Sequence, residues 1–360
     1  MTIDDKNIIW LDLFEFLSYQ KKDKILKCFE KGQDIRKLFT STPKIREILT
    51  NEEYFKMSVK LTDEFLALKI AQYEKDNINC ITIYNDAYPH LLKQISTPPF
   101  CLYCKGNMQL LNTICIGVVG TRHPSDYGIV TTNQLVSELV DVDLTIVSGM
   151  AIGVDTLAHR KTLEKQGKTI AVLAGGFNHI YPVSNIKLSR EILENNLLIT
   201  ENAPDTLPLA YLFLARNRII AGLSKAVLIT EAGEKSGALN TCNYALEYNR
   251  EVFAVPGKIN SQMSKGTNKL IRDMKAHVVL SGDDILTTLN IEKEKINANL
   301  GIQLDINAQI VLNYIQTEKK TFQQIADFTK LSASELNTIL LELELNGFVT
   351  KLANNSYIAS

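Results

Sequence analysis

The sequence lacks an excess of charge of either sign. Its 360 residues contain 39 lysines and arginines against 40 aspartates and glutamates, which gives a formal net charge of -1. A generally basic protein is therefore excluded, and any site for an anion has to be local. The chain also lacks internal repeats and low-complexity segments, which argues against a repeat architecture.

Long apolar runs are missing too. No apolar stretch approaches the roughly 20 residues that a membrane-spanning helix needs. At the N-terminus, Asp4 and Asp5 precede the first lysine, Lys6, and no small-residue cleavage site follows, which is unlike a secretory signal. We therefore expect a cytoplasmic protein without a membrane span.

Cysteine is sparse, with six residues in the chain, and only Cys101 and Cys104 have the spacing of metal ligands. No second CxxC pair or nearby pair of histidines accompanies them. Both cysteines are predicted to be small apolar residues of a strand, and no metal site is expected.

The apolar pattern divides the chain into four segments. Helical spacing in residues 1–78 predicts a small N-terminal helical domain of the SAM or helix-hairpin type. In residues 79–290, apolar runs alternate with helix-like segments, which predicts a Rossmann-like, doubly wound, mostly parallel α/β sheet. The polar residues 291–303 predict a linker, and a helix, turn, helix and hairpin pattern in residues 304–360 predicts a winged-helix domain.

Three glycine-rich turns, GVVGTR, SGMAIGVD and EAGEKSG, follow apolar runs of the predicted sheet. The carboxyl ends of parallel strands meet at one edge, and open α/β sheets bind ligands in the crevice there. A phosphorylated ligand is favoured, because free turn N–H groups can hold an oxyanion and Arg122 adds a fork of donors. In the third turn, Lys235 and Ser236 flank Gly237 ahead of a helix and resemble another anion site.

Basic residues occur beside an aromatic one in the segment FLARNR, which contains Phe213, Arg216, Asn217 and Arg218. Such a combination can pair with phosphates and stack on bases of a single strand. Alternatively, Phe213 belongs to the core and one arginine makes an internal ion pair, although at least one arginine should face the crevice. The lysine-rich stretch 258–275 is either a solvated face or a basic rim of the crevice.

Nucleophilic catalysis is considered for Ser148 at a strand end, Asp155 near the start of the next helix and His159 one turn further along that helix. The G-x-S-x-G pattern of a hydrolase elbow is absent. Asp155 is better explained as a capping residue, and His159 as a packed or buried, hydrogen-bonded side chain.

The segments GVVGTRHPSDYG, SGMAIGVDTLAH, YPVSN, FLARNRIIAGLS, EAGEKSGALNT, REVFAVPG and KGTNKLI resemble, in this order and spacing, the DNA processing protein A family (DprA, also called Smf). The resemblance covers Pro98 to about Leu280. It implies a non-catalytic, cofactor-free protein of natural transformation and competence, which protects incoming single-stranded DNA and loads the recombinase RecA onto it.

The resemblance also implies a homodimer formed through the Rossmann-like domain, with the apolar segments 226–232 and 243–252 as candidate surfaces. The DNA-binding residues it indicates, together with those of the turns, are Gly120, Thr121, Arg122, Ser148, Gly149, Phe213, Arg216, Asn217, Arg218, Lys235, Ser236, Gly237 and Lys265. The chain departs from the family in having no lysine just ahead of Phe213, so DNA affinity should depend more on the arginines.

Two other functions remain open. A related superfamily contains nucleotide phosphoribohydrolases, but SGALNT stands where the enzyme motif G-T-x-x-E would be. A winged-helix regulator of duplex DNA is the second alternative. It is disfavoured because the presumed recognition helix carries Glu335, Glu342 and Glu344 and no lysine or arginine, and phosphate repels such a helix.

Overall fold

The computed structural model describes residues 1–291, 305–315, 319–345, 348–352 and 356–359. By its internal contacts the chain divides into two compact units, Met1–Lys293 and Glu294–Ser360. Apart from its first residue, the predicted linker 291–303 lies outside the described residues. No helix in the described ranges is long and apolar enough to cross a membrane.

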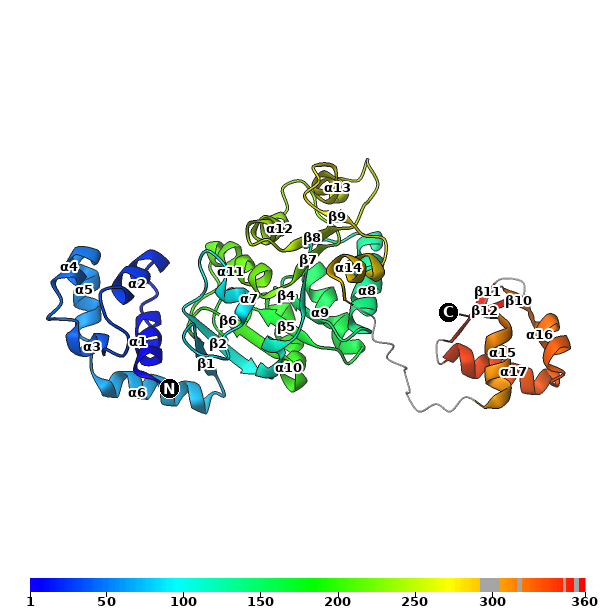
Figure 1. The fold of residues 1–360 in the computed structure, drawn as a ribbon, viewed down its shortest axis with the longest axis horizontal. Coiled ribbons are helices and arrows are strands. Elements are labelled where there is room, and N and C mark those ends of the chain that lie inside the picture. Colours follow the sequence, from blue (N-terminus) through cyan, green and yellow to red (C-terminus); the bar gives the residue numbers. More distant parts are fainter. Residues whose placement is uncertain (292–304, 316–318, 346–347, 353–355, 360) are drawn as a thin grey trace. The chain divides into compact units, whose positions relative to one another are not determined.

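A nine-stranded sheet forms the centre of the first unit, in the order β1-β2-β6-β5-β4-β3-β7-β8-β9 (Figure 1). Strands β3 to β9 pair in parallel with their neighbours, whereas β2 is antiparallel to both β1 and β6. The doubly wound, mostly parallel sheet is thereby confirmed. The strands are β1 (Asn79–Thr82), β2 (Cys101–Gly106), β3 (Cys115–Val119), β4 (Thr145–Ser148), β5 (Thr169–Val172), β6 (Leu197–Thr200), β7 (Ala226–Ile229), β8 (Glu251–Ala254) and β9 (His277–Val278).

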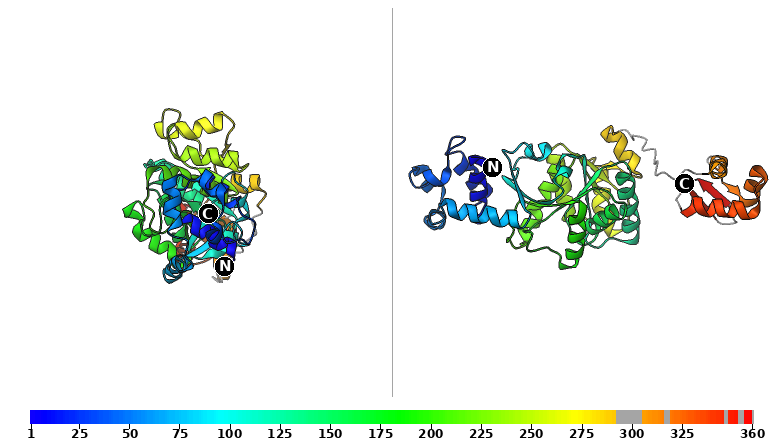
Figure 2. Two further views of the ribbon diagram at one scale, coloured as in Figure 1. Left: turned by 90° about the vertical axis from the view of Figure 1, so that its left-hand side faces the viewer. Right: turned by 90° about the horizontal axis from the view of Figure 1, so that it is seen from below.

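Helices cover both faces of this sheet (Figure 2). Alternate residues of the central strands point to opposite faces, so Val147 packs in one core with α11 and α12 while Ile146 packs in another with α8 and α9. Burial on both faces explains why these strands are continuously apolar. The helices are α7 (His90–Lys93), α8 (Asp126–Val140), α9 (Val154–Glu164), α10 (Ile186–Asn195), α11 (Ala210–Leu223), α12 (Ala238–Glu247), α13 (Lys265–Arg272) and α14 (Gly282–Leu289).

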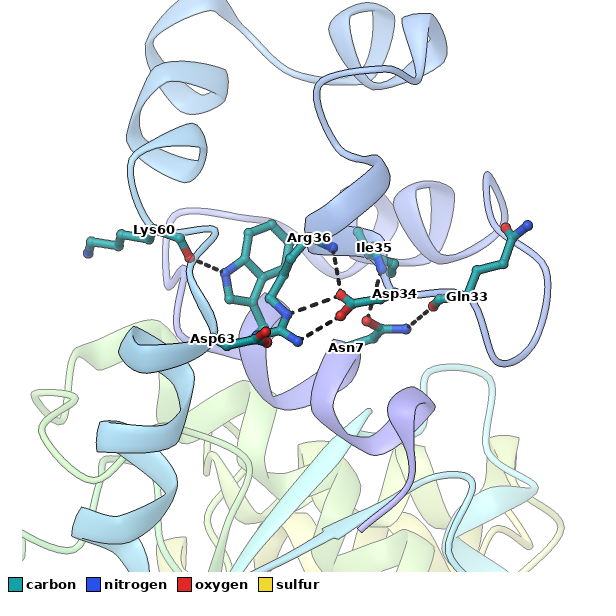
Figure 3. Close-up of polar contacts among 8 residues, drawn as sticks. Asn7, Gln33, Asp34, Ile35, Arg36, Lys60 and Asp63 are labelled. Carbon is teal, nitrogen blue, oxygen red and sulfur yellow. Dashed lines mark hydrogen bonds and ion pairs between the residues drawn. The ribbon is translucent and has the colours of Figure 1, made fainter.

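The N-terminal helical region is built around Trp10, the single tryptophan of the chain, which is fully buried. Its indole Nε1 donates to the carbonyl oxygen of Lys60 at 2.7 Å (Figure 3). Asn7 donates to the carbonyl of Gln33 at 2.7 Å and accepts from the amide of Ile35 at 3.1 Å. The helices are α1 (Ile3–Asp12), α2 (Tyr19–Leu26), α3 (Ile35–Leu38), α4 (Pro43–Ile48), α5 (Asn51–Ser58) and α6 (Asp63–Lys75).

The second unit is a winged helix, as predicted. Its three-stranded antiparallel sheet has the order β10-β12-β11. The buried residues Val311, Ile325 and Leu336 join its three helices in one core. The elements are α15 (Ile306–Ile315), β10 (Lys320–Thr321), α16 (Phe322–Thr329), α17 (Ala333–Leu345), β11 (Val349–Leu352) and β12 (Ser356–Ala359).

Candidate functional site

A cavity of about 460 Å³ lies at the carboxyl ends of β3 and β7. The chain winds outward from β3 to β6 and then returns to the other side of β3 to form β7 and β8. The loops that follow β3 and β7 therefore diverge and leave a crevice, the place where open α/β sheets bind ligands. We call this cavity the switch-point cavity.

The three glycine-rich turns meet at this edge of the sheet, as predicted. The predicted site residues that line the cavity are Gly120, Thr121, Arg122, Phe213, Arg216, Asn217, Lys235, Ser236 and Gly237. Nine further lining residues were not predicted as site residues, namely Val119, Ala151, Asp155, Leu214, Ile220, Gly233, Ala238, Thr241 and Met263. The helical spacing of α11 contained a signal for two of them, because Leu214 and Ile220 lie one turn from Asn217 and Arg216, respectively.

Two backbone amides at the first turn, those of Thr121 and Ser125, donate within the protein and are therefore not free as predicted. The amide of Thr121 donates to the carbonyl of Glu231 at 2.7 Å. The amide and hydroxyl of Ser125 donate to the carboxylate of Glu231 at 2.8 and 2.7 Å. The buried Glu231 thus places a negative charge at the start of α8, where an oxyanion was expected to bind.

Arg122 is the side chain of the first turn that can hold an anion. Its side chain is exposed and lines the switch-point cavity. In the part of the chain that the structure describes, no ion pair involves Arg122. The turn itself is held rigidly, because the amide of Val154 donates to the carbonyl of Thr121 at 3.1 Å.

The polar groups of the second turn make hydrogen bonds within the protein. Ser148 is fully buried and its hydroxyl donates to the carbonyl of Val118 at 2.7 Å. The amides of Gly149 and Ala151 donate to the buried carboxylate of Asp155 at 3.1 and 3.3 Å. Neither Ser148 nor Gly149 is among the lining residues. Their prediction as DNA-contacting residues is therefore not supported by the geometry. The helix-capping role predicted for Asp155 is wrong, because the N-cap of α9 is Gly153 without a side-chain hydrogen bond and the Asp155 carboxylate accepts from loop amides ahead of the helix.

Arg216 lies between this turn and the cavity, with a residue exposure of 4 %. Its guanidinium donates to the carbonyls of Gly149 and Val172. Burial lowers the pKa of Arg216 to about 10, against the opposing effect of the Asp155 carboxylate. The group thus remains a cation at neutral pH, but two of its hydrogen bonds are made to the protein itself.

Arg218 does not face the switch-point cavity, which corrects its prediction as a site residue. It pairs with the Glu201 carboxylate and lines a different cavity. Adjacent residues of a helix point about 100° apart, so Asn217 and Arg218 cannot face the same side. The predicted internal ion pair of one arginine is thereby confirmed.

The third turn opens into the cavity at the start of α12. Lys235 is exposed, and Gly237 is the N-cap of α12 without a side-chain hydrogen bond. The amide of Ala238 donates to the Ser236 hydroxyl at 3.3 Å. Lys265, at the start of α13, is exposed and is not among the lining residues, so the geometry does not support its prediction.

A model of the DNA recombination-mediator protein A family matches residues 79–290, and a model of the DprA winged helix domain matches residues 300–355. The chain belongs to the DNA recombination-mediator protein A family. The first match contains all three turns and the whole lining of the switch-point cavity.

Curated relatives in this family include the DNA processing protein DprA of Bacillus subtilis, 42% identical over 221 residues, which cover 61% of this chain and 74% of the relative. Protein Smf of Synechocystis is 33% identical over 320 residues, which cover 78% of this chain and 80% of the relative.

Two solved structures of DprA proteins are similar. The DprA of Streptococcus pneumoniae has a TM-score of 0.68 and 34% identity, over 80% of this chain and 98% of the other. A structure from Helicobacter pylori, described as showing the single-stranded DNA binding mode of DprA, has a TM-score of 0.54 and 34% identity. It covers 59% of this chain and 96% of that chain.

Phe213 lines the switch-point cavity as a half-buried side chain and is not part of the core clusters. Its ring meets the exposed ring of Tyr181 edge-on, with centroids 5.5 Å apart. The alternative that Phe213 is a core residue is therefore wrong, and its ring is available at the cavity wall.

His159 is a fully buried residue of α9. Its Nδ1 lies 2.7 Å from the hydroxyl of Thr169. Burial, with a smaller effect of the Arg216 cation, lowers the pKa of His159 from 6.5 to about 3. The packed or buried, hydrogen-bonded role predicted for this histidine agrees with the geometry.

The buried His159 predicts a pH dependence of stability. Below pH 6.5 the imidazole of His159 binds a proton in the unfolded state but stays neutral in the folded state. The free energy of unfolding therefore falls as pH decreases toward about 3. This residue should contribute up to about 1.4 kcal/mol per pH unit. Urea unfolding followed by Trp10 fluorescence between pH 7 and pH 4.5 measures the slope. A His159→Gln variant with an unchanged slope would contradict the assignment.

Proposed function

We propose that the chain binds single-stranded DNA in the switch-point cavity and holds it without cutting it. The observation that carries this proposal is the exposed Arg122, which has no ion pair in the described ranges, at the edge of a cavity it shares with Lys235 and Phe213. Two cations supply phosphate contacts, and one aromatic ring supplies a stacking face, which is the combination that single-strand grooves use.

Binding without cleavage is supported by the contacts of the polar residues near the cavity. The hydroxyl of Ser148 is buried and donates to a main-chain carbonyl. His159 is buried and, with its lowered pKa, neutral. The carboxylate of Glu231 accepts from Ser125 at the start of α8. Nucleophile, base and acid are thus each committed to structural contacts.

The test is a comparison of a labelled oligothymidylate with a duplex of equal length, by fluorescence anisotropy on the full chain. We expect tighter binding of the single strand, and a sequencing gel should show the strand intact after binding. Equal or tighter binding of the duplex would contradict the proposal. Backbone contacts carry no sequence information, so single strands of different sequence should bind similarly.

The winged-helix unit is proposed to contribute little to this affinity. On α17, Glu335, Glu342 and Glu344 are exposed, and the helix contains no lysine or arginine. A phosphate backbone is repelled by such a face. Deleting residues 304–360 should change the dissociation constant for oligothymidylate by less than about threefold. A loss as large as that of Arg122→Ala would show that the unit binds DNA directly.

We further propose that the chain transfers the bound strand to the recombinase RecA and acts as a homodimer through its Rossmann-like domain. The family's description as a recombination mediator supports the first part. Of the two candidate dimer surfaces, residues 226–232 include β7, which is fully buried between β3 and β8 and cannot serve. Sedimentation of the full chain tests the dimer, and RecA filament formation on coated single strands tests the transfer.

A further inference from the structure

A second cavity, of about 590 Å³, lies between the N-terminal helices and the β6–α11 loop. One wall comes from the end of α1 and the start of α2, and the other from the loop after β6 and from α11. Phe100, stacked on Tyr19 at 4.6 Å between ring centroids, also contributes to the lining. We call this cavity the acidic groove.

Carboxylates outnumber cations in the acidic groove. The lining contains four carboxylates, Asp12, Glu15, Glu201 and Asp205, against two cations, Lys22 and Arg218. Both cations are already paired, Lys22 with Asp12 at 2.6 Å and Arg218 with Glu201. The formal excess of two carboxylates over cations repels a phosphate chain and attracts a cation.

The pairing at the groove is also incomplete. Asp12 Oδ2 and Arg218 Nη1 are buried and have no hydrogen-bond partner within the described residues. Buried polar atoms are nearly always satisfied in folded proteins, so such atoms indicate a site completed by water or by a bound group.

The rim of the groove is apolar and exposed. Phe16 is 42 % exposed, Leu207 55 %, Leu209 48 % and Tyr211 64 %. A cluster of exposed apolar side chains around a polar floor is typical of a surface that binds another protein. A small inorganic cation would use the carboxylates but not this rim.

We propose that the acidic groove binds a peptide segment of a protein partner in which lysine or arginine alternates with apolar residues. The basic side chains meet the carboxylates, and the apolar side chains cover the rim. Charge complementarity selects this occupant over a nucleic acid strand, which the groove's charge repels. The proposal goes beyond single-strand binding and does not depend on it.

The acidic groove and the proposed DNA site lie on different faces of the same helix, α11. Helix α11 contributes Phe213 and Asn217 to the switch-point cavity, and Tyr211 and Arg218 to the acidic groove. A partner segment in the groove would therefore be held beside the bound strand without competing for its contacts.

The probe is a fluorescein-labelled synthetic peptide with the sequence Lys-Leu repeated four times, titrated with the full chain in an anisotropy assay. Two control peptides replace every lysine by glutamate or every leucine by serine. We expect each control peptide to bind at least about tenfold more weakly, because both charge and apolar contact are required. Equal binding of either control peptide would overturn the proposal.

Variants locate the probe on the protein. The double variant Asp205→Lys/Tyr211→Ala changes two exposed groove residues and should weaken the binding of the lysine–leucine peptide about tenfold. The control Asp86→Lys changes an exposed carboxylate outside the groove and should have little effect on peptide binding. The double variant should keep its affinity for oligothymidylate, which also shows that it is folded. Unchanged peptide binding in the double variant, or displacement of the peptide by oligothymidylate, would overturn the proposal. Failure of oligothymidylate to bind the wild-type chain would refute the DNA-binding proposal alone.

Discussion

Replacing Arg122 by alanine is expected to weaken the binding of single-stranded DNA by about 10- to 100-fold. A hydrogen bond to a charged group contributes about 1.5–3 kcal/mol, and 1.4 kcal/mol corresponds to a tenfold change in the dissociation constant. Arg122 can supply this much because its exposed guanidinium has no ion pair within the described residues and lies at the cavity wall. Fluorescence anisotropy with a labelled oligothymidylate measures the effect.

Arg160 offers a matched control for that variant. It is an exposed arginine of α9 that is not among the residues lining the cavity. Arg160→Ala removes the same charge, so it should change the affinity by less than about threefold. An equal loss in both variants would mean that general charge attraction, and not the local site, explains the binding.

Replacing Arg216 by alanine is expected to lower the free energy of unfolding by about 3–5 kcal/mol, the range for removing one partner of a buried charge pair. The variant leaves the carbonyls of Gly149 and Val172 without their guanidinium donor. It also removes the cation that stabilises the ionised form of the buried Asp155 carboxyl. Urea unfolding followed by the fluorescence of Trp10, which belongs to the same compact unit, measures the change.

Comparison with Arg122→Ala distinguishes the structural role of Arg216 from the DNA-binding role of Arg122. Arg122 is exposed, so its replacement should change the stability by less than about 0.5 kcal/mol. The free energy of unfolding of Arg216→Lys should lie between those of the wild type and Arg216→Ala, because an ammonium keeps the charge but cannot reproduce the planar fork of donors. Arg216→Ala with wild-type stability and weakened DNA binding would show that Arg216 contacts the strand directly.

The fold could be predicted from the sequence because its signals are local and repeated. Apolar runs such as ICIGVVG form strands buried on both faces, and the glycine-rich turns follow from their position at strand ends. Parallel pairing then brings these turns to one edge without any knowledge of side-chain contacts. The location of the cavity follows from that topology alone.

Side-chain directions within the site could not be predicted in the same way. Ser148 and Arg218 both belong to motifs near the cavity, yet Ser148 turns inward to Val118 and Arg218 turns away to Glu201. The hydrogen bonds of the Thr121 and Ser125 amides depend on Glu231, which lies 106 residues from Ser125 in the sequence. Contacts of such sequence separation leave no periodic signal in a single sequence.

The salt dependence of single-strand affinity tests the central claim most directly. For a single strand, the logarithm of the affinity falls with the logarithm of the salt concentration with a slope of about -0.7 per phosphate contact. Measured on the wild-type chain and on Arg122→Ala, the two slopes should differ by about 0.7, because one phosphate contact is lost. Identical slopes would contradict the account, since Arg122 would then hold no phosphate at the edge of the sheet.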